Sequence, residues 1–379
     1  MVFDGKSFLL PRENYDGWFL DGETCIRQSH SIDDVCALHD IDLNLPIPSK
    51  YSAMLESLGV NSNSFSPWGG LLPKHVLQTH SRAVVERANR GFAQCPREYY
   101  ESTFVPGNHV LFSLEKPKID VKKYRLWFRP RPMLHTFKPD ENGYAEPVKY
   151  SRFNSRTGRL TVKSGPHILT LPKEFRGILK SRYRNGSIMV LDYVSFEAQI
   201  ALSCSGRQPI KDVYAKVQKD VFRDKIPRDI VKRVTLAHMF GMGTASFAKA
   251  TKLIGNDLIR SETALKMFFN DELLAKLSKP VGQKIKNYYG REVQASAKYT
   301  STNTYIQSTA VDSALLGFSN VVKHIKKQAI EAVPLFVIHD GFVLDCSPDA
   351  LKRTDELIEV GGHIQGFEGM FPLKMKVFE

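Results

Sequence analysis

The stretch PLFVIHDGFVLDC, Pro334–Cys346, places a short polar segment between two apolar runs. Apolar residues on both sides predict two strands, and the Asp-Gly pair between them predicts a tight hairpin whose two turn residues, Asp340 and Gly341, both need φ > 0. Turn formation alone explains polar residues at this tip. A chemical role for His339 and Asp340 is the alternative, and the rest of the chain decides between the two.

A second apolar strand also ends in a carboxylate. The run SIMVLDY, Ser187–Tyr193, reaches Asp192 after five residues of strand character. Capping or turn formation explains most such residues, but two carboxylates on neighbouring strands repel each other unless they share cations. Two Mg²⁺ ions about 3.5–4 Å apart are the arrangement that in-line phosphoryl displacement uses. Asp192 and Asp340 are therefore candidate ligands of Mg²⁺, with a triphosphate supplying further oxygens.

A helix with a cationic face lies between these two strands in the sequence. The segment PRDIVKRVTLAHMFG, Pro227–Gly241, has Pro at the first helical position and Gly just past the end. Four residues spaced four apart share one face of this helix: Arg228, Lys232, Leu236 and Phe240. Two cations, an apolar residue and a ring suit a nucleotide, although an amphipathic helix with two solvated bases has the same pattern. A nucleotide triphosphate with bound Mg²⁺ suits both the two aspartates and this cationic helix face.

Composition limits the class of partner. The 379 residues suffice for two or three compact units, and 42% hydrophobic with 25% charged residues is typical of globular proteins. The net charge of +13 favours a polyanion, nucleic acid more than a membrane surface. No run of about 18 apolar residues predicts a membrane span. Five scattered cysteines without a CxxC pair, and an N-terminus unlike a signal peptide, favour a reducing, cytoplasmic location.

The remaining periodicity predicts the fold class. Helices are expected at Lys74–Phe92, ended by Gly91, at Asp212–Phe222 and at Thr304–Ile330, and a strand at Gly186–Val194. Strand, helices, long helix and hairpin in this order predict an α+β sheet layer with an inserted helical unit. The segment 122–139 interleaves bases with aromatics, which suits either a nucleic-acid strip or a solvated, proline-broken connector.

Residues 150–345 resemble family A DNA polymerases, the DNA polymerase I family. Five segments match that family's motifs in order: TGRLTVKSGPHILTLP (Thr157–Pro172) is similar to TGRLS…PNLQNIP, LDYVSFEAQIAL (Leu191–Leu202) to motif A, RDIVKRVTLAHMFG (Arg228–Gly241) to motif B, NTYIQSTAVD (Asn303–Asp312) to NAPMQGTAAD, and IHDGF (Ile338–Phe342) to motif C. One such motif arises easily by chance. Five in order over half the chain form a specific signal.

The resemblance implies a metal site. Asp192 is expected to be the first metal ligand, with the Tyr193 carbonyl beside it, and Asp340 the second. The implied cofactor is Mg²⁺, as two ions, for which Mn²⁺ can substitute.

The resemblance also implies substrate contacts. Arg228 and Lys232 are expected on the triphosphate, with Lys232 able to protonate the leaving pyrophosphate, and Glu197 is expected to select deoxyribose as a steric gate. Further positions expected at the dNTP are Tyr214, Leu236 and Phe240. Those expected along the primer–template DNA are Arg159, Asn303, Gln307 and, near the primer end, His339.

Several positions depart from the family pattern. Phe240 replaces a Tyr, Tyr214 replaces a phosphate-binding His, and Gly341 replaces the second acid of motif C. In addition, Ala198–Gln199 replaces Leu-Arg, and Tyr299 stands where an Arg is usual. These changes bear on turnover, nucleotide affinity and fidelity more than on the type of reaction, because both aspartates, Arg228 and Lys232 remain.

The implied architecture is a right hand with an antiparallel-sheet palm, helical fingers inserted in the palm and a reduced thumb. The expected divisions are 1–145 for an N-terminal region with the thumb, 146–210 for the first palm segment, 211–300 for the fingers and 301–379 for the second palm segment. The first 145 residues are too few for a nuclease and a thumb together, so no proofreading exonuclease domain is expected. The acidic pair Asp21 and Glu23 is interpreted as a loop, and a short thumb predicts low processivity.

The predicted function is template-directed addition of dNTPs to a primer 3′-OH. Its predicted partners are primer–template DNA, dNTPs and a separate exonuclease or processivity factor, without a membrane, in a protein encoded by a phage, plasmid or other mobile element. One alternative is a single-subunit RNA polymerase or primase-like enzyme, which Glu197 disfavours, although Phe240 lacks the hydroxyl that helps such enzymes prefer ribose. The other is a catalytically lapsed polymerase fold that serves as a nucleic-acid-binding accessory protein.

Overall fold

The computed structural model describes residues 73–93, 97–127, 131–152, 154–155, 158–295 and 300–378, with short pieces at 2–3, 8–9, 51, 53–54 and 57. Two compact units divide between Phe112 and Ser113. The finer predicted division into palm and fingers segments stays a prediction. Asp21, Glu23 and Tyr299 lie outside the described residues.

The first unit is mainly helical in its described part. Helix α3, Lys74–Ala93, begins where the sequence predicts and continues two residues past Gly91. A second helical segment follows, with α4 (Arg97–Tyr99), a π-helical stretch (Tyr100–Phe104) and α5 (Val105–Phe112). The sequence analysis missed this segment, because Pro106 and Gly107 are helix-breaking residues inside it. The short strands β1 (Val2–Phe3) and β2 (Phe8–Leu9) pair antiparallel.

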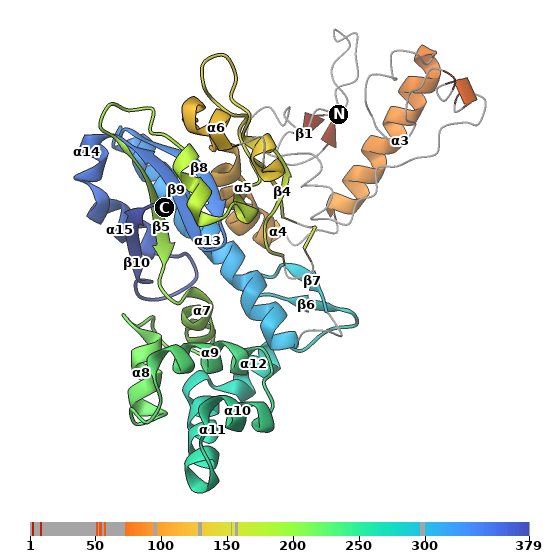
Figure 1. The fold of residues 1–379 in the computed structure, drawn as a ribbon. Helices are drawn as coiled ribbons and strands as arrows, with labels where there is room; N and C mark the ends of the chain where they lie inside the picture. Colours follow the sequence, from red (N-terminus) through yellow and green to blue (C-terminus); the bar gives the residue numbers. More distant parts are fainter. Residues whose placement is uncertain are drawn as a thin grey trace. The chain divides into compact units, whose positions relative to one another are not determined.

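An antiparallel sheet organises the second unit. Its strands lie in the order β10 (Leu373–Val377), β5 (Ser187–Tyr193), β9 (Gly341–Cys346) and β8 (Ala332–Ile338). The long helix α13, Ser301–Lys327, packs against this sheet together with α15, Thr354–Gly362 (Figure 1). The predicted α+β class, the strand before Val194 and the long helix are confirmed.

A cluster of helices is inserted between β5 and α13, as predicted. After α7 (Phe196–Cys204) come α8 (Val213–Asp220), α9 (Arg228–Met239), α10 (Thr244–Thr251), α11 (Gly255–Phe269) and α12 (Asp271–Leu277), the green and teal helices of Figure 1. A small hairpin of β6 (Lys284–Lys286) and β7 (Glu292–Gln294) then leads to α13. Pro227 is the N-cap of α9 and not its first helical residue, a shift of one position.

Short elements precede the sheet in the second unit. They are α6 (Val121–Trp127), the 3₁₀ turns Pro132–Phe137, Ile168–Thr170 and Lys173–Ile178, and the paired strands β3 (Lys149–Ser151) and β4 (Thr161–Ser164). Helix α14, Pro348–Leu351, follows the sheet's hairpin. The segment 122–139 thus contains most of α6 and a 3₁₀ turn in its described parts, and the Arg131 guanidinium lies 4.4 Å from the ring centre of Phe175. Neither of its two predicted roles is tested.

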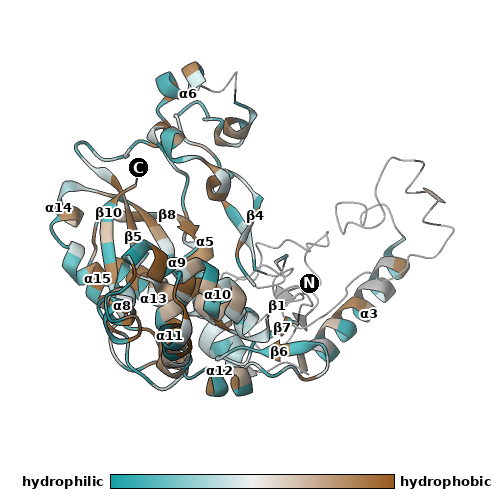
Figure 2. Ribbon diagram, turned by 60° about the horizontal axis from the view of Figure 1, so that its bottom comes forward, coloured by the Kyte–Doolittle hydropathy of each residue, from teal (hydrophilic) through white to brown (hydrophobic). Residues whose placement is uncertain are grey.

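Aromatic side chains join the end of β5 to the helices around it. Tyr193 stacks on Phe196 of α7 with ring centres 4.1 Å apart and lies 5.6 Å from Phe318 of α13, which in turn lies 4.9 Å from Phe342 of β9. Figure 2 shows the hydrophobic residues that run along β5 and β8. These contacts fix the strand end that carries Asp192. Among the described residues, no helix combines the length and hydrophobicity needed to cross a bilayer.

A buried ion cluster ties the loop before β4 to α13. Asp312 accepts hydrogen bonds from Arg152 at 2.9 Å and from Asn287 at 2.8 Å, and Arg291 lies 3.4 Å from the same carboxylate. Arg291 also donates to the Arg152 carbonyl at 2.6 Å. Gly158 fits against this cluster, because a Cβ there would lie 2.9 Å from the Arg291 guanidinium. The cluster therefore positions the backbone immediately before Arg159.

Candidate active site

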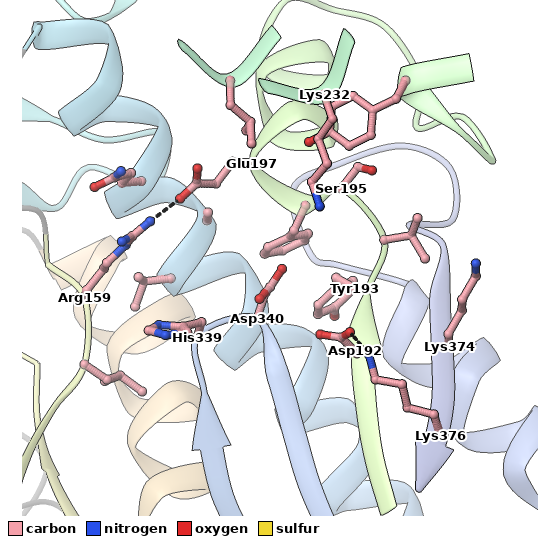
Figure 3. A pocket seen from close by; sticks show the side chains of 18 of the residues that line it. Arg159, Asp192, Tyr193, Ser195, Glu197, Lys232, His339, Asp340, Lys374 and Lys376 are labelled. Atoms are coloured by element: carbon pink, nitrogen blue, oxygen red, sulfur yellow. Dashed lines mark hydrogen bonds and ion pairs between the residues drawn. The ribbon is translucent and has the colours of Figure 1, made fainter. Parts of the chain in front are cut away.

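The hairpin brings the two aspartates to neighbouring strand ends. Asp192 pairs with Gly341 in the β5–β9 register, and the backbone N–H of Tyr193 donates to the Asp340 carbonyl at 3.2 Å. The proximity predicted for Asp192 and Asp340 is therefore present. Figure 3 shows both side chains at the same edge of the sheet.

The turn itself differs from the prediction by one residue. Ile338 pairs with Gly341, so the two turn residues are His339 and Asp340, and only His339 has a positive φ, at +55°. Gly341 is in the strand, where a larger residue would pack tightly against its neighbours. A Cβ at Gly341 would lie 3.0 Å from Val190 and 3.5 Å from an Asp192 carboxylate oxygen. The position where the family has a second acid is thus packed against the neighbouring strand.

The two carboxylates differ in their electrostatic surroundings. Burial, together with the negative charge of Asp192, raises the pKa of Asp340 to about 6. Asp192 instead has a cation beside it, since the Lys376 ammonium lies 2.7 Å from its Oδ2. Lys376 comes from β10, the strand that pairs with β5 on its other side. Asp340 has no such ion pair among the described residues.

The aspartates lie in a pocket of about 960 Å³ within the second unit. Its walls come from the end of β5 and the start of α7, from α8 and α9, from α13, from the hairpin tip and from β10 (Figure 3). The predicted residues that line it are Arg159, Asp192, Tyr193, Glu197, Tyr214, Arg228, Lys232, Leu236, Gln307, His339 and Asp340. The structure therefore collects most of the predicted site in one place.

Two of the predicted residues, both within the described ranges, do not line the pocket. Phe240 is the C-cap of α9, beyond the end of the cationic face. Asn303 lies in the first turn of α13 and is 3% exposed, with its backbone N–H capped by the Thr300 hydroxyl at 3.2 Å. Phe240 directly follows Met239, the last helical residue, and its role at the dNTP stays a prediction. The burial of Asn303 depends on tertiary packing that spacing does not reveal.

Two cations enter the pocket from α9. Arg228 forms an ion pair with Asp212, the N-cap of α8, at 2.8 Å. Lys232 lies 6.0 Å from the centre of the Tyr214 ring and has no ion pair with a described carboxylate. Burial raises the pKa of Tyr214 to about 12, so this residue is a neutral phenol at pH 7. Lys232 is therefore available to an anionic ligand.

The predicted steric gate is held by an arginine. Ser195, with φ of +56°, turns the chain sharply from β5 into α7 and so puts Glu197 in the first helical turn. The Arg159 guanidinium donates to the Glu197 carboxylate at 2.6 Å (Figure 3). Burial and the positive charge of Arg159 lower the pKa of His339, which is therefore neutral at pH 7.

The side chain of Tyr193 belongs to the core. Its hydroxyl donates to the Gly361 carbonyl at 2.6 Å, and burial raises its pKa well above the ordinary value. Gly317 of α13 makes room for that hydroxyl, because a Cβ there would lie only 1.9 Å from it. The backbone of Tyr193 is the part left for the pocket.

The donor set fits Mg²⁺ bound together with a substrate. No group of three or more His, Cys, Asp or Glu side chains able to hold a metal occurs among the described residues. Mg²⁺ needs fewer, since it keeps waters and takes one or two carboxylates plus substrate phosphates. The raised pKa of Asp340 beside Asp192 marks a place where a cation lowers the energy of two like charges.

The sequence analysis missed two lysines of the pocket wall. Lys374 and Lys376 line the pocket from β10, one on each side of Met375. The alternation LKMKV at 373–377 indicates a strand with both lysines on one face. Nothing in the sequence indicates that this face lies beside Asp192, because the pairing of β10 with β5 joins distant segments.

Comparisons with known proteins agree with this geometry. No family model matches the chain. It is 22% identical to DNA polymerase I of Aquifex aeolicus (strain VF5) over 245 residues, which are 58% of this chain and 42% of that protein. A solved structure, the POL domain of Pol1 from M. smegmatis in complex with DNA primer-template and dNTP, matches with a TM-score of 0.59 at 13% identity, over 90% of this chain and 80% of that one.

The chain has the fold of a DNA polymerase I polymerase domain. The predicted resemblance to family A DNA polymerases and the right-hand α+β fold are confirmed. The chain spans about two fifths of the length of its curated relative. The roles of the individual site residues remain predictions.

Proposed function

We propose that this protein is a template-directed DNA polymerase that adds dNTPs to a primer 3′-OH. The observation that carries the proposal is the placement of Asp192 and Asp340 at neighbouring strand ends, in one pocket with Lys232 and Arg228. The relative's name, DNA polymerase I, and the DNA primer-template and dNTP bound in the M. smegmatis domain support it.

Asp192 and Asp340 would hold two Mg²⁺ ions, with the backbone carbonyl of Tyr193 beside them. When bound, the ions activate the attacking hydroxyl and stabilise charge on the transferred phosphate, and Mn²⁺ can replace them. The ionised form of both carboxylates is required for this binding. Because the pKa of Asp340 is about 6, its carboxylate is mostly ionised at pH 8 and mostly protonated at pH 5.

The cations of α9 bind the nucleotide. Lys232 has no competing ion pair with a described residue and is the stronger candidate for the triphosphate and for the proton given to leaving pyrophosphate. Arg228 also lines the pocket, and its guanidinium is shared with Asp212. Leu236, one turn further along α9, offers an apolar surface to the base.

Sugar selection depends on an ion pair in this protein. Glu197 is the residue that would exclude a ribose 2′-OH, and Arg159 holds its carboxylate at 2.6 Å. Phe240 has no hydroxyl and does not line the pocket, so it offers no second anchor for Glu197. We infer that Arg159 orients the gate as well as contacting the primer–template.

The DNA path follows the residues that face the pocket beside α13. Gln307 lines the pocket, and neutral His339 at the hairpin tip can accept or donate a hydrogen bond near the primer terminus. Asn303 is buried, so it supports the start of α13 unless DNA binding exposes it. We also propose that a separate exonuclease or processivity factor is a partner of this protein. Its gene would belong to a phage, plasmid or other mobile element.

Primer extension tests the function directly. A labelled primer on a DNA template with Mg²⁺ should be extended with dNTPs and far more slowly with NTPs. A clear preference for NTPs would support a single-subunit RNA polymerase or primase-like enzyme instead. Binding of the primer–template without any incorporation, in Mg²⁺ or Mn²⁺, would support a lapsed polymerase fold that acts as an accessory protein.

A further inference from the structure

Lys374 and Lys376 lie on β10, the edge strand of the sheet. Lys374 pairs with Asp192 in the β10–β5 register, and Lys376 pairs with Val190. Residues two apart on a strand point to the same face, so both lysines share the face of Asp192. Both line the pocket, and Figure 3 shows them beside Asp192, while Lys232 reaches in from α9.

The charges of the pocket are not balanced at this wall. Arg159 is paired with Glu197, Arg228 with Asp212 and Lys376 with Asp192. Lys232 and Lys374 have no ion pair with any described carboxylate. The pocket therefore has an unpaired cation on each of two walls, Lys232 on α9 and Lys374 on β10, with Asp192 and Asp340 in the same pocket.

Lysines on an edge strand also have a general explanation. They discourage pairing with the edge of another sheet, because the charge keeps the strand solvated. That explanation requires charge on the edge but not on a particular face. Here both lysines lie on the pocket face, and the intervening residue on the other face is Met375. Packing of β10 against α15 explains why both lysines share one face, and the proposal rests on that face being a wall of the pocket.

We propose that Lys374 and Lys376 form a second phosphate-binding arm, opposite Arg228 and Lys232, for the polyphosphate of a nucleotide or the pyrophosphate released from it. The proposal rests on the proposed function, which supplies a triphosphate in this pocket. Lys374 contacts the polyphosphate directly. Lys376 is paired with Asp192 in the free protein. When Asp192 binds another cation, Lys376 turns to the phosphate instead, because the lysine side chain is long and flexible.

The missing second acid of motif C is consistent with this arm. Gly341 removes a negative charge from the hairpin, and β10 adds two positive charges across β5. The pocket is therefore more cationic on the β10 side than the family pattern would make it. A more cationic wall strengthens the hold on a polyphosphate and slows its release.

Polyphosphate binding without DNA, metal or turnover tests the arm. The full chain is titrated with inorganic tripolyphosphate by isothermal calorimetry at low salt. Lys374→Met should weaken binding about tenfold, as expected for loss of one charge-assisted contact. Lys374→Arg should retain binding to within about twofold, because the positive charge is kept. Lys323→Met, an exposed lysine of α13 outside the pocket, is the matched control for the general effect of the +13 charge.

The outcomes separate this inference from the proposed function. Failure of the wild-type chain to bind tripolyphosphate, or equal binding by the wild type and Lys374→Met, would overturn the arm. Equal weakening in Lys374→Met and Lys323→Met would overturn it too, since the binding would then be non-specific. A chain that binds tripolyphosphate through Lys374 but extends no primer would retain the arm and lose the polymerase assignment. In an active enzyme, Lys374→Met should also raise the pyrophosphate concentration needed for product inhibition.

Discussion

Asp340 is a carboxyl group of the pocket whose ionisation opposes folding near neutral pH. Burial and the charge of Asp192 raise its pKa to about 6, against an ordinary 3.8. A carboxylate with a raised pKa binds its proton more tightly in the folded than in the unfolded chain. The folded state is therefore favoured by protonation, and the metal-free protein loses stability as the pH rises from about 4 to about 6.

The variant Asp340→Asn should remove this loss. At pH 4 the metal-free variant and wild type should have similar free energies of unfolding. At pH 7 the variant should be more stable by up to about 3 kcal/mol, which is the value of two pKa units. Urea unfolding at the two pH values, with a chelator present, measures the difference. An equal difference at both pH values would contradict the electrostatic explanation.

The ion pair of Arg159 with Glu197 predicts a shared effect on sugar choice. Glu197→Ala should raise incorporation of NTPs relative to dNTPs, because the side chain proposed to exclude the 2′-OH is lost. Arg159→Ala should shift the same ratio in the same direction while leaving Glu197 in place. Single-nucleotide incorporation with matched dNTP and NTP gives the ratio. If Arg159→Ala lowers both rates equally, Arg159 contacts DNA only and does not orient the gate.

At the scale of elements, α13 and β5 are held together through one close approach. Gly317 lets the Tyr193 hydroxyl reach the Gly361 carbonyl, and a Cβ at this position would lie 1.9 Å from that hydroxyl and 2.7 Å from the carbonyl oxygen. Ala is ordinarily favoured over Gly inside a helix by about 1 kcal/mol. The close approach reverses that preference here.

Gly317→Ala should therefore destabilise the protein by about 1–3 kcal/mol, as overpacking does. Thermal and urea unfolding of the variant measure the change. Lys323→Ala, at an exposed position of the same helix, is the control and should leave stability within about 0.5 kcal/mol of wild type. A Gly317→Ala variant more stable than wild type would show that Tyr193 moves aside without cost.

The regular elements were predictable because their side-chain periods are local. The 3.6 period around Lys232 and along 304–330, and the apolar run before Asp192, gave helices α9 and α13 and strand β5 within a few residues. The hairpin was predicted but its turn was displaced by one residue. A sequence cannot distinguish a glycine with φ > 0 from one in a tightly packed strand, and Gly341 is of the second kind.

At the scale of the whole molecule, the positive charge predicts salt-sensitive binding of nucleic acid. The formal net charge is +13, and each phosphate neutralised releases condensed counterions. Affinity for primer–template should fall linearly on a log–log plot against salt, with a slope of about −0.9 per phosphate contact. Fluorescence anisotropy at several salt concentrations measures it. A slope near zero would contradict binding through the phosphate backbone.

Long-range pairing is what the sequence could not supply. The Asp312 cluster joins residues from three separate segments, and Lys376 contacts Asp192 across 184 residues of sequence. Each of these residues has an ordinary local context. Most of the pocket could be anticipated from motifs in order, whereas the cations of β10 and the burial of Asn303 required the packed structure.

The central claim is that Asp192 and Asp340 act together in nucleotidyl transfer. The most direct measurement is single-nucleotide primer extension by Asp192→Asn and Asp340→Asn in Mg²⁺, beside anisotropy measurements of primer–template affinity on the same preparations. The rate of extension should fall at least about 10³-fold in both variants, because the aspartates are proposed to hold the catalytic metal ions. The affinity for primer–template should stay within about threefold of wild type, because DNA is bound mainly through its phosphates. Extension by either variant at a rate close to wild type would contradict the claim.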